Sequence, residues 1–108
     1  MKEKILVVDD EEGIRFSFEF FLSDEGYQVS TAASYSEAVE LINKDDYDLI
    51  FADIILDRKT GIDLLKVARR SQPTTPVVMI TGVPSIETAT ESLRIGALDY
   101  IIKPIRQD

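Results

Sequence analysis

Residues 5–10 read Ile-Leu-Val-Val-Asp-Asp, an apolar run that ends in two carboxylates. Strands that are buried on both faces have this continuous Val- and Ile-rich character, and such strands occur in parallel sheets. Residues 49–52 and 77–80 repeat the pattern, and less regular apolar runs occur at 28–32 and 98–102. The sequence therefore predicts five short strands, three of which are buried on both faces.

Amphipathic helical patterns separate these runs. Ser34 to Glu37 form a capping box before the second helix, Pro73 stops the third, and Gly96 ends the fourth. The alternation of strand and helix predicts an α/β fold with a doubly wound five-stranded parallel sheet and right-handed crossovers. The predicted core faces are Ile14, Phe18, Phe21 and Leu22; Ala38, Leu41 and Ile42; Ile62, Leu65 and Ala68 or Arg69; and Ile86, Ala89 and Leu93.

The composition limits the range of functions. The chain has 108 residues, which suits a single domain. Its net charge of -8 opposes direct nucleic-acid binding by this segment and favours a cation or a basic partner. The absence of cysteine and histidine excludes disulfides, histidine-ligated zinc and a histidine general base. No apolar run reaches the ~18 residues of a membrane span, so we expect a cytoplasmic protein without membrane contact.

The last predicted strand is followed only by residues 103–108. An edge strand with one uncovered face is a poor place for a domain to end. We therefore expect residues 1–108 to be a C-terminally truncated domain whose last helix is missing from this chain.

Polar side chains follow the predicted strands. Asp9 and Asp10 follow the first strand, Asp53 the third, Thr81 the fourth and Lys103 the fifth. In the strand order 2-1-3-4-5, neighbouring strands ~4.8 Å apart bring the aspartates and Thr81 together at the carboxyl edge, where ligands bind. Lysine has a stem long enough to bridge two strand spacings. Three carboxylates favour Mg²⁺, and a nearby lysine and threonine suit phosphate oxygens, which indicates a magnesium-assisted phosphoryl site with a carboxylate nucleophile.

With these residues in place, the chain resembles the receiver domain of two-component response regulators. The resemblance covers the whole chain and rests on ILVVDDEEGIR (5–15), FADI (51–54), MITG (79–82) and DYIIKP (99–104). It implies a flavodoxin-like fold and a regulatory domain rather than a metabolic enzyme. The implied partners are a sensor histidine kinase, which donates the phosphoryl group, and an output domain or partner protein in phosphorelay signal transduction.

The resemblance also implies how the acidic residues act. Asp53 resembles the phosphoacceptor. Asp9 and Asp10 resemble the acidic pair that holds Mg²⁺ together with Asp53, and the backbone carbonyl of Ile55 resembles a further ligand. The absence of histidine means that the phosphohistidine donor lies in another chain or domain.

Three further positions resemble the parts of the family's switch. Thr81 resembles the residue that follows the phosphoryl group, and Lys103 resembles the residue that forms a salt bridge to it. Tyr100 resembles the aromatic switch on the face made by the fourth helix and the fifth strand. The Lys103–Pro104 bond resembles the family's cis peptide, which would aim the lysine inward.

The stretch ILDRKTGIDLL (55–65) resembles receivers attached to AAA+ enhancer-binding transcription activators. This resemblance implies control of transcription, and a phosphorylation-linked homodimer is a candidate assembly. Asp57 departs from the proline that many receivers carry four residues after the phosphoacceptor. The departure puts the rigidity of that loop and the start of the next helix in question.

Several residues allow a second interpretation. Asp9 and Asp10 could cap the first helix, although Asp53 and Lys103 at the matching strand ends favour a site. We interpret Glu11 and Glu12 as helix-dipole partners that face water.

Phe16 and Phe20 lie on a different helical face from Ile14 and Phe21. They either pack on a missing helix or loop, or form a docking surface for a kinase or second protomer. Thr88, Thr90 and Ser92 are mediocre helix formers, which suits a helix that shifts between states unless tertiary packing overrides propensity.

The sequence also allows two rival functions. A magnesium phosphohydrolase with an aspartyl nucleophile commonly needs an acid two residues later, where this chain has Ile55. A degenerate receiver that acts only as a binding module would lack part of the site, whereas all five site residues are present. Hydrophobic Ile55 and Val83 beside the site position water poorly, which favours a long-lived phosphoryl group.

Overall fold

The computed structural model describes residues 2–56 and 59–103. Strands and helices alternate along it in the order β1 (Lys4–Val8), α1 (Glu12–Asp24), β2 (Gln28–Ala32), α2 (Tyr35–Lys44), β3 (Leu49–Asp53), α3 (Gly61–Ser71), β4 (Val77–Thr81), α4 (Ile86–Ile95) and β5 (Asp99–Ile102). The five strands form one parallel sheet in the order β2-β1-β3-β4-β5, so the predicted topology is confirmed. The last strand begins at Asp99, one residue later than predicted.

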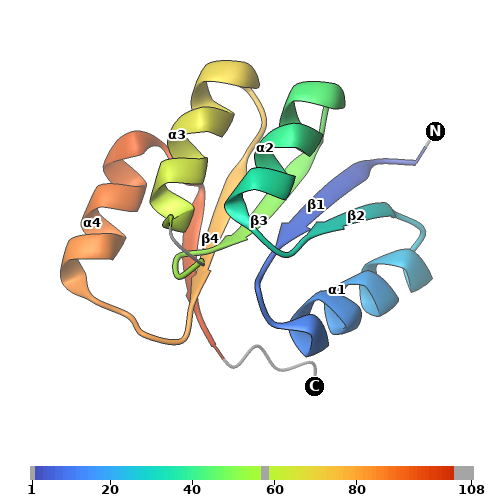
Figure 1. Ribbon diagram of the computed structural model, residues 1–108, viewed down its shortest axis with the longest axis horizontal. Helices are drawn as coiled ribbons and strands as arrows, with labels where there is room; N and C mark the ends of the chain where they lie inside the picture. The colour runs from blue at the N-terminus through green and yellow to red at the C-terminus, as the bar shows by residue number, and fades with distance from the viewer. Residues whose placement is uncertain (1, 57–58, 104–108) are drawn as a thin grey trace.

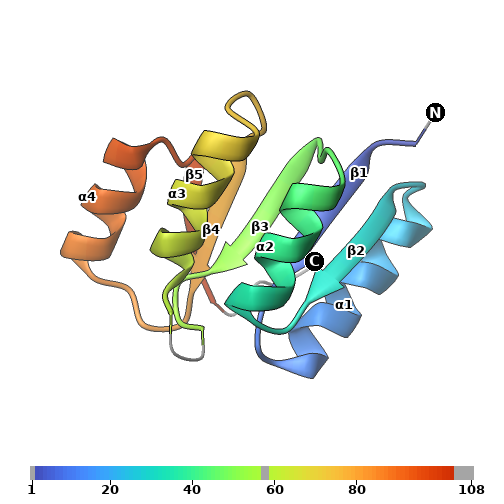
Figure 2. The same cartoon turned by 45° about the horizontal axis from the view of Figure 1, so that its top comes forward.

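The sheet is covered on both faces. Helices α2, α3 and α4 lie together on one face and α1 lies on the other (Figures 1 and 2). Every residue of β4 is buried, and Leu6, Ile50 and Met79 from three adjacent strands are fully excluded from solvent. The apolar runs of the central strands therefore supply the core, as parallel strands covered on two sides require.

The register of the sheet aligns the ends of the strands that carry the predicted site. Val8 pairs with Ala52, Asp53 pairs with Ile80, and Thr81 pairs with Ile102. The residues that end or follow these strands consequently share one edge of the sheet. Backbone pairing alone thus brings together side chains that are up to 94 positions apart, as from Asp9 to Lys103.

Helix α1 is packed less deeply than predicted. Ile14, Phe18 and Leu22 are half-buried, and the Phe18 ring lies 5.0 Å from the ring of Phe51 on β3. Phe21 was expected on the same face, but it is 41% exposed and its ring contacts the edge of the Phe20 ring. The prediction for Phe21 is therefore wrong, because the contact face of α1 is narrower than its apolar stripe.

Phe16 and Phe20 do lie away from the core, as their helical positions predict. Both side chains are exposed, and their rings are stacked with centroids 6.5 Å apart. Whether a partner or another segment covers them stays a prediction.

Helix α3 has a start that we did not predict. Thr60 Oγ1 accepts a hydrogen bond from the Asp63 N–H, and the Asp63 carboxylate accepts one from the Thr60 N–H, which makes a reciprocal capping box. These hydrogen bonds lower the pKa of Asp63 below its ordinary value. Ile62, Leu65 and Ala68 are buried as expected, while Arg69 instead donates to the carbonyls of Pro73 and Thr75.

The capping box predicted for α2 forms only in part. Ser34 Oγ accepts a hydrogen bond from the Glu37 N–H at 3.2 Å, as expected. The Glu37 carboxylate, however, accepts from the Ala33 N–H at 2.8 Å, one residue before the cap. Both hydrogen bonds at the helix start are therefore made, but the Glu37 carboxylate bonds the N–H of Ala33 instead of that of Ser34.

Helix α4 is turned relative to the prediction. Ile86 is 82% exposed and Leu93 is 53% exposed, whereas Ser92 is fully buried. The reason is local, since Ser85 caps the helix and Thr88 hydrogen-bonds the hydroxyl of Tyr100 on β5, which fixes the hydroxyl-bearing side inward. Of the predicted apolar face, Ile86 and Leu93 therefore point outward, while Ala89 is half-buried.

The amino end of the sheet is fastened by Gln72, a buried residue that follows α3. Its side-chain amide donates to the carbonyls of Ile42 and Asp45 at the end of α2, and its oxygen accepts from the Tyr47 N–H. Thr75 donates to the Tyr47 carbonyl at 2.8 Å. We call these five residues the Gln72 clasp, and it lies at the end of the strands opposite the predicted site.

Across residues 2–56 and 59–103, the structure contains no helix that is both long and apolar enough to cross a membrane. Asp57 and the Lys103–Pro104 bond, for which the resemblance gave expectations, lie outside the described residues.

Candidate functional site

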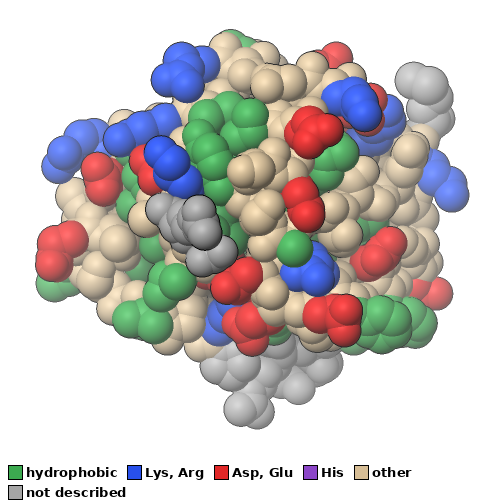
Figure 3. Space-filling view, viewed as in Figure 1, with side chains coloured by type: hydrophobic (Ala, Val, Ile, Leu, Met, Phe, Trp, Pro, Cys, Tyr) green, Lys and Arg blue, Asp and Glu red, His purple; other side chains and the backbone are tan. Residues whose placement is uncertain are grey.

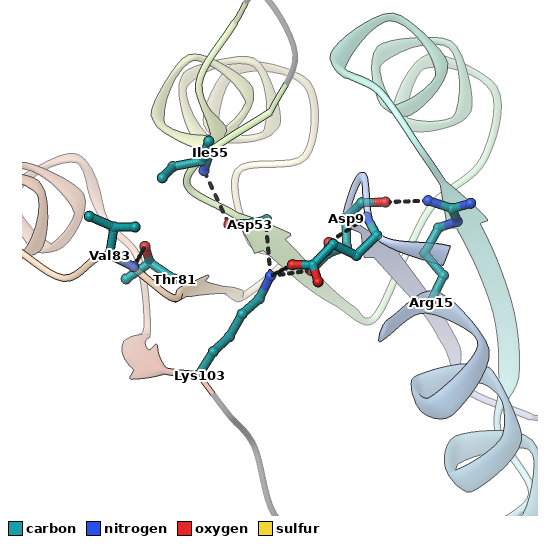
Figure 4. Close-up of polar contacts among 8 residues, drawn as sticks. Asp9, Arg15, Asp53, Ile55, Thr81, Val83 and Lys103 are labelled. Atoms are coloured by element: carbon teal, nitrogen blue, oxygen red, sulfur yellow. Dashed lines mark hydrogen bonds and ion pairs between the residues drawn. The ribbon is translucent and has the colours of Figure 1, made fainter. Parts of the chain in front are cut away.

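Lys103 lies at the centre of the predicted site. Its Nζ is 2.9 Å from Asp53 Oδ2, 2.9 Å from Glu11 Oε1 and 3.0 Å from Asp9 Oδ2 (Figure 4). Burial alone would lower the pKa of Lys103, but its hydrogen bonds to Asp53 and Glu11 outweigh burial and raise it. The ammonium therefore stays charged and joins the ends of β1, β3 and β5.

The backbone of β5 aims this lysine at the site. The Lys103 N–H donates to the Thr81 carbonyl at 2.8 Å, which extends the β4–β5 pairing by one residue. An added Cβ at Gly82 would lie 3.7 Å from Lys103 Cδ, so the lysine stem runs beside that glycine. Sheet pairing thus directs the long side chain back over the strand ends.

Asp53 is buried at the end of β3. Its Oδ1 accepts a hydrogen bond from the Ile55 N–H at 3.1 Å, which leaves Oδ2 directed at Lys103. The first residue of α3, Gly61, donates its N–H to the Ile54 carbonyl at 2.7 Å. A Cβ at Gly61 would collide with the Asp53 carbonyl oxygen, so only glycine allows α3 to start this close to the carboxylate.

Asp9 is also buried, with its side chain only 2% exposed. Its Oδ1 accepts from the Glu11 N–H at 2.9 Å, whereas its Oδ2 has the ion pair with Lys103 at 3.0 Å but no hydrogen bond from any described group. Burial raises the pKa of Asp9, although the Glu11 N–H and Lys103 oppose the rise. Ionised Asp9 is therefore costly here, and a further cation beside Oδ2 would relieve that cost.

The carboxylates together form a set that suits a hard cation. Oxygens of Asp9, Asp10, Glu11 and Asp53 all lie within 4.8 Å of one another. All four donors are oxygens, the ligand type that Mg²⁺ prefers. The buried Oδ2 of Asp9, which has an ion pair with Lys103 but no hydrogen bond, is the observation that makes these residues fit a bound cation. In Figure 3 acidic side chains gather along the lower edge, where the strands end in Figure 1.

Glu11 is exposed, as we interpreted it, but it is not only a helix-dipole partner. It occupies the N-cap position of α1 without capping the helix, and its carboxylate reaches Lys103 instead. The acidic run at 9–12 was the available signal, but the contact joins positions 92 residues apart. Glu12 is exposed in the first turn of α1, as expected.

Arg15 is a second residue that we did not predict at the site. Its guanidinium Nη1 donates to the backbone carbonyl of Asp9 at 2.7 Å (Figure 4). This hydrogen bond ties the first turns of α1 to the loop that carries the acidic pair. Sequence spacing gave no indication of it, since the acceptor is a backbone atom.

Thr81 is fully buried at the end of β4. Its Oγ1 accepts a hydrogen bond from the Val83 N–H at 3.0 Å and is hydrogen-bonded to neither Asp53 nor Lys103 within the described ranges. The exposed side chains of Ile55 and Val83 follow the ends of β3 and β4. The rim of the site beside Thr81 is therefore apolar.

Tyr100 is half-buried on β5, and strand β4 separates it from Asp53 on β3. Its hydroxyl lies 2.8 Å from Thr88 Oγ1 and accepts from the Ser85 N–H at 3.3 Å. Ser85 Oγ also lies 2.9 Å from Thr88 Oγ1, so three hydroxyls form one group. We call Ser85, Thr88 and Tyr100 the hydroxyl cluster; it links α4 to β5.

Comparison with known proteins points to one family. The profile of the response regulator receiver domain matches residues 5–108. The alginate biosynthesis transcriptional regulatory protein AlgB of Pseudomonas aeruginosa is 39% identical over 105 residues, which cover 97% of this chain. The same alignment covers 23% of AlgB, so the chain spans less than a quarter of the length of that relative.

Solved structures agree with this result. A response regulator from Burkholderia pseudomallei, described with a phosphorylated aspartic acid, calcium ion and citrate, has a TM-score of 0.93 and 30% identity and covers 97% of this chain and 62% of its own. The beryllofluoride-activated NtrC4 receiver domain dimer has a TM-score of 0.89 and 32% identity, with 95% of this chain and 85% of its own covered.

Proposed function

Because the chain belongs to the response regulator receiver family, we propose that it accepts a phosphoryl group on Asp53 and changes its surface in response. The observation that carries this proposal is the contact of Lys103 Nζ with Asp53 Oδ2, at 2.9 Å, beside a buried Asp9 oxygen that accepts no hydrogen bond from any described group. A fixed cation and a cation-binding carboxylate set beside one nucleophilic carboxylate are the electrostatic requirement of phosphoryl transfer.

The donor is a phosphohistidine of a partner sensor kinase, since this chain has no histidine. An Asp53 carboxylate oxygen attacks the phosphorus and forms a P–O bond. The P–N bond to the imidazole breaks, and the imidazole nitrogen keeps the electron pair and takes up a proton. The phosphorylated aspartic acid described for the Burkholderia pseudomallei protein is the precedent in a relative.

The residues proposed to hold Mg²⁺ are Asp9, Asp10 and Asp53, with the backbone carbonyl of Ile55. When bound, Mg²⁺ supplies positive charge that offsets the charge of the transferring phosphoryl group. The buried Asp9 carboxylate orients this set through its hydrogen bond from the Glu11 N–H. Lys103 binds a phosphoryl oxygen from the other side and keeps the acyl phosphate close to β5.

Thr81 and Tyr100 are proposed to transmit the change. Thr81 exchanges its hydrogen bond from the Val83 N–H for a phosphoryl oxygen, and the space that it leaves admits the Tyr100 ring. The face made by α4 and β5 then changes shape and is read by an output domain or a partner protein. The apolar Ile55 and Val83 place no side-chain base near attacking water, so we expect the phosphoryl group to persist for longer than seconds.

The proposed cellular role is control of transcription in phosphorelay signal transduction, as a regulator rather than a metabolic enzyme. AlgB is named a transcriptional regulatory protein, and residues 55–65 resemble receivers of AAA+ enhancer-binding activators. This chain would then be the cytoplasmic receiver part of a longer regulator. A phosphorylation-linked homodimer is supported by the NtrC4 receiver, which is described as a dimer.

Incubation with Mg²⁺ and acetyl phosphate, followed by intact-mass measurement, tests this proposal. We expect a gain of one phosphoryl group per chain that is stable in acid and labile in base, and no gain for Asp53→Asn. The absence of any gain in the wild-type chain would overturn the proposal. Sustained turnover of phosphate esters would instead indicate a phosphohydrolase.

A further inference from the structure

The three carboxylates around Lys103 differ in how easily each can leave it. Asp9 and Asp53 have side chains that are 2% and 5% exposed, whereas the Glu11 side chain is 62% exposed. If either buried aspartate lost its contact with Lys103, a charge would remain in a poorly solvated place. Glu11 can turn into water at little cost, because exposed ion pairs contribute little to stability.

Three carboxylates already crowd around Lys103. Two of the three N–H donors of its ammonium group bond to Glu11 and Asp53, and Asp9 Oδ2 lies 3.0 Å away as an ion-pair partner. A phosphoryl group on Asp53 brings further oxygens and about two negative charges at the same place. These oxygens must enter the space that the three carboxylates share, so the carboxylate that moves most easily gives way, and the added charge repels one that stays.

We propose that Glu11 is a releasable anchor of Lys103, which holds the lysine in the unphosphorylated domain and must be displaced when a phosphoryl group binds it. This inference rests on the proposed function, and it adds a residue that competes with the phosphoryl group. Glu11 is in position for this task because its carboxylate does not cap α1 and instead accepts a hydrogen bond from Lys103 at 2.9 Å. It is a positioning residue, since it acts through Lys103.

The adjacent Glu12 provides a matched control. It carries the same charge, lies in the first turn of α1 and is exposed, and the described ion pairs of Lys103 do not include it. Glu11→Gln and Glu12→Gln therefore remove one charge from neighbouring positions, and only the first removes the anchor. Glu11→Asp keeps the charge but shortens the side chain, so it distinguishes the effect of the contact with Lys103 from the effect of the negative charge.

The binding experiment is a calorimetric titration of beryllofluoride at saturating Mg²⁺. We expect Glu11→Gln and Glu11→Asp to lower the dissociation constant about two- to five-fold, the range of an exposed ion pair. Glu12→Gln should match the wild type. Binding by Glu11→Gln that is equal to or weaker than that of Glu12→Gln would overturn the proposal, and so would a Glu11→Asp value equal to the wild type.

Two further measurements separate this inference from its premise. The ¹⁵N resonance of the Lys103 ammonium, recorded without Mg²⁺ or beryllofluoride, should change in Glu11→Gln and not in Glu12→Gln. In a titration with Mg²⁺ alone, Glu11→Gln should lose no more Mg²⁺ affinity than Glu12→Gln does. A larger loss of affinity would make Glu11 a metal ligand instead. If the wild type binds no beryllofluoride, the proposed function and the inference are both wrong. If the wild type binds it and the Glu11 variants bind it with the same affinity, only the inference is wrong.

Discussion

Helices α3 and α4 lie side by side on the same face of the sheet, but they are anchored very differently (Figures 1 and 2). Helix α4 has one buried residue, Ser92, and its hydroxyl has no hydrogen-bond partner within the described ranges. Helix α3 buries Gly61, Ile62, Leu64, Leu65, Val67 and Ala68. The helix that follows Asp53 is therefore fixed by the core, while the helix that follows Thr81 buries much less and adds only the half-buried Ile95 to the core.

This difference suits a domain in which chemistry and signal output are separated. The proposed phosphoacceptor, Asp53, needs a rigid surrounding, because its oxygens must be held in place. A surface that changes shape needs a low cost of movement, and local openings begin where few apolar contacts are buried. Several exposed apolar side chains also lie on α4 and beside it, namely Val83, Ile86, Leu93, Leu98 and Ile102.

The largest expected effect comes from making one substitution in both helices. Leu65→Ala in α3 should lower the free energy of unfolding by about 2–5 kcal/mol, because it leaves a cavity in the core. Leu93→Ala in α4 should change it by less than about 0.5 kcal/mol, because that side chain is largely exposed. Urea unfolding of the two variants measures the difference, and equal losses would contradict the contrast between the helices.

Glycine substitutions sharpen the comparison at the start of α3. Gly61→Ala should lower the free energy of unfolding by about 1–3 kcal/mol, because its Cβ must displace the Asp53–Ile54 backbone. Gly13→Ala in α1 is the control; no atom of the described residues lies within 4 Å of an added Cβ, and alanine should stabilise the helix by about 0.5–1 kcal/mol. Thermal unfolding should show shifts of opposite sign. A neutral Gly61→Ala would mean that α3 is not held against Asp53.

The smallest effect concerns the hydroxyl cluster of α4. Thr88→Val removes a hydrogen bond to Tyr100 and should cost about 1 kcal/mol, while Thr90→Val, at an exposed position, should be close to neutral. In the Tyr100→Phe background the cost of Thr88→Val should shrink, since the partner is already lost. Chemical denaturation of the wild type, the two single variants Thr88→Val and Tyr100→Phe, and the double variant gives the coupling free energy between the two side chains. A cost of Thr88→Val that is unchanged in the Tyr100→Phe background would show that the hydroxyl cluster does not tie α4 to β5.

The sheet was predictable from the sequence because continuous apolar runs and alternation with helices leave few topologies open. The convergence of Asp9, Asp53 and Lys103 followed from strand order alone. The inward face of α4 was mispredicted because its orientation depends on hydroxyl contacts with Tyr100, which apolar periodicity ignores. Glu11 was misread for a similar reason, since a contact across 92 positions overrides the local preference of an acid at a helix start.

The Gln72 clasp has a consequence for experiments on this chain. The backbone N–H of Tyr47 donates to Gln72 inside this buried network at the amino end of the sheet. It should therefore exchange with solvent deuterium only when the whole domain unfolds. The amides of α4 should exchange through small openings that leave the clasp intact. One deuterium-exchange spectrum would thus hold its own internal reference, in which Tyr47 reports global stability and α4 reports the local change.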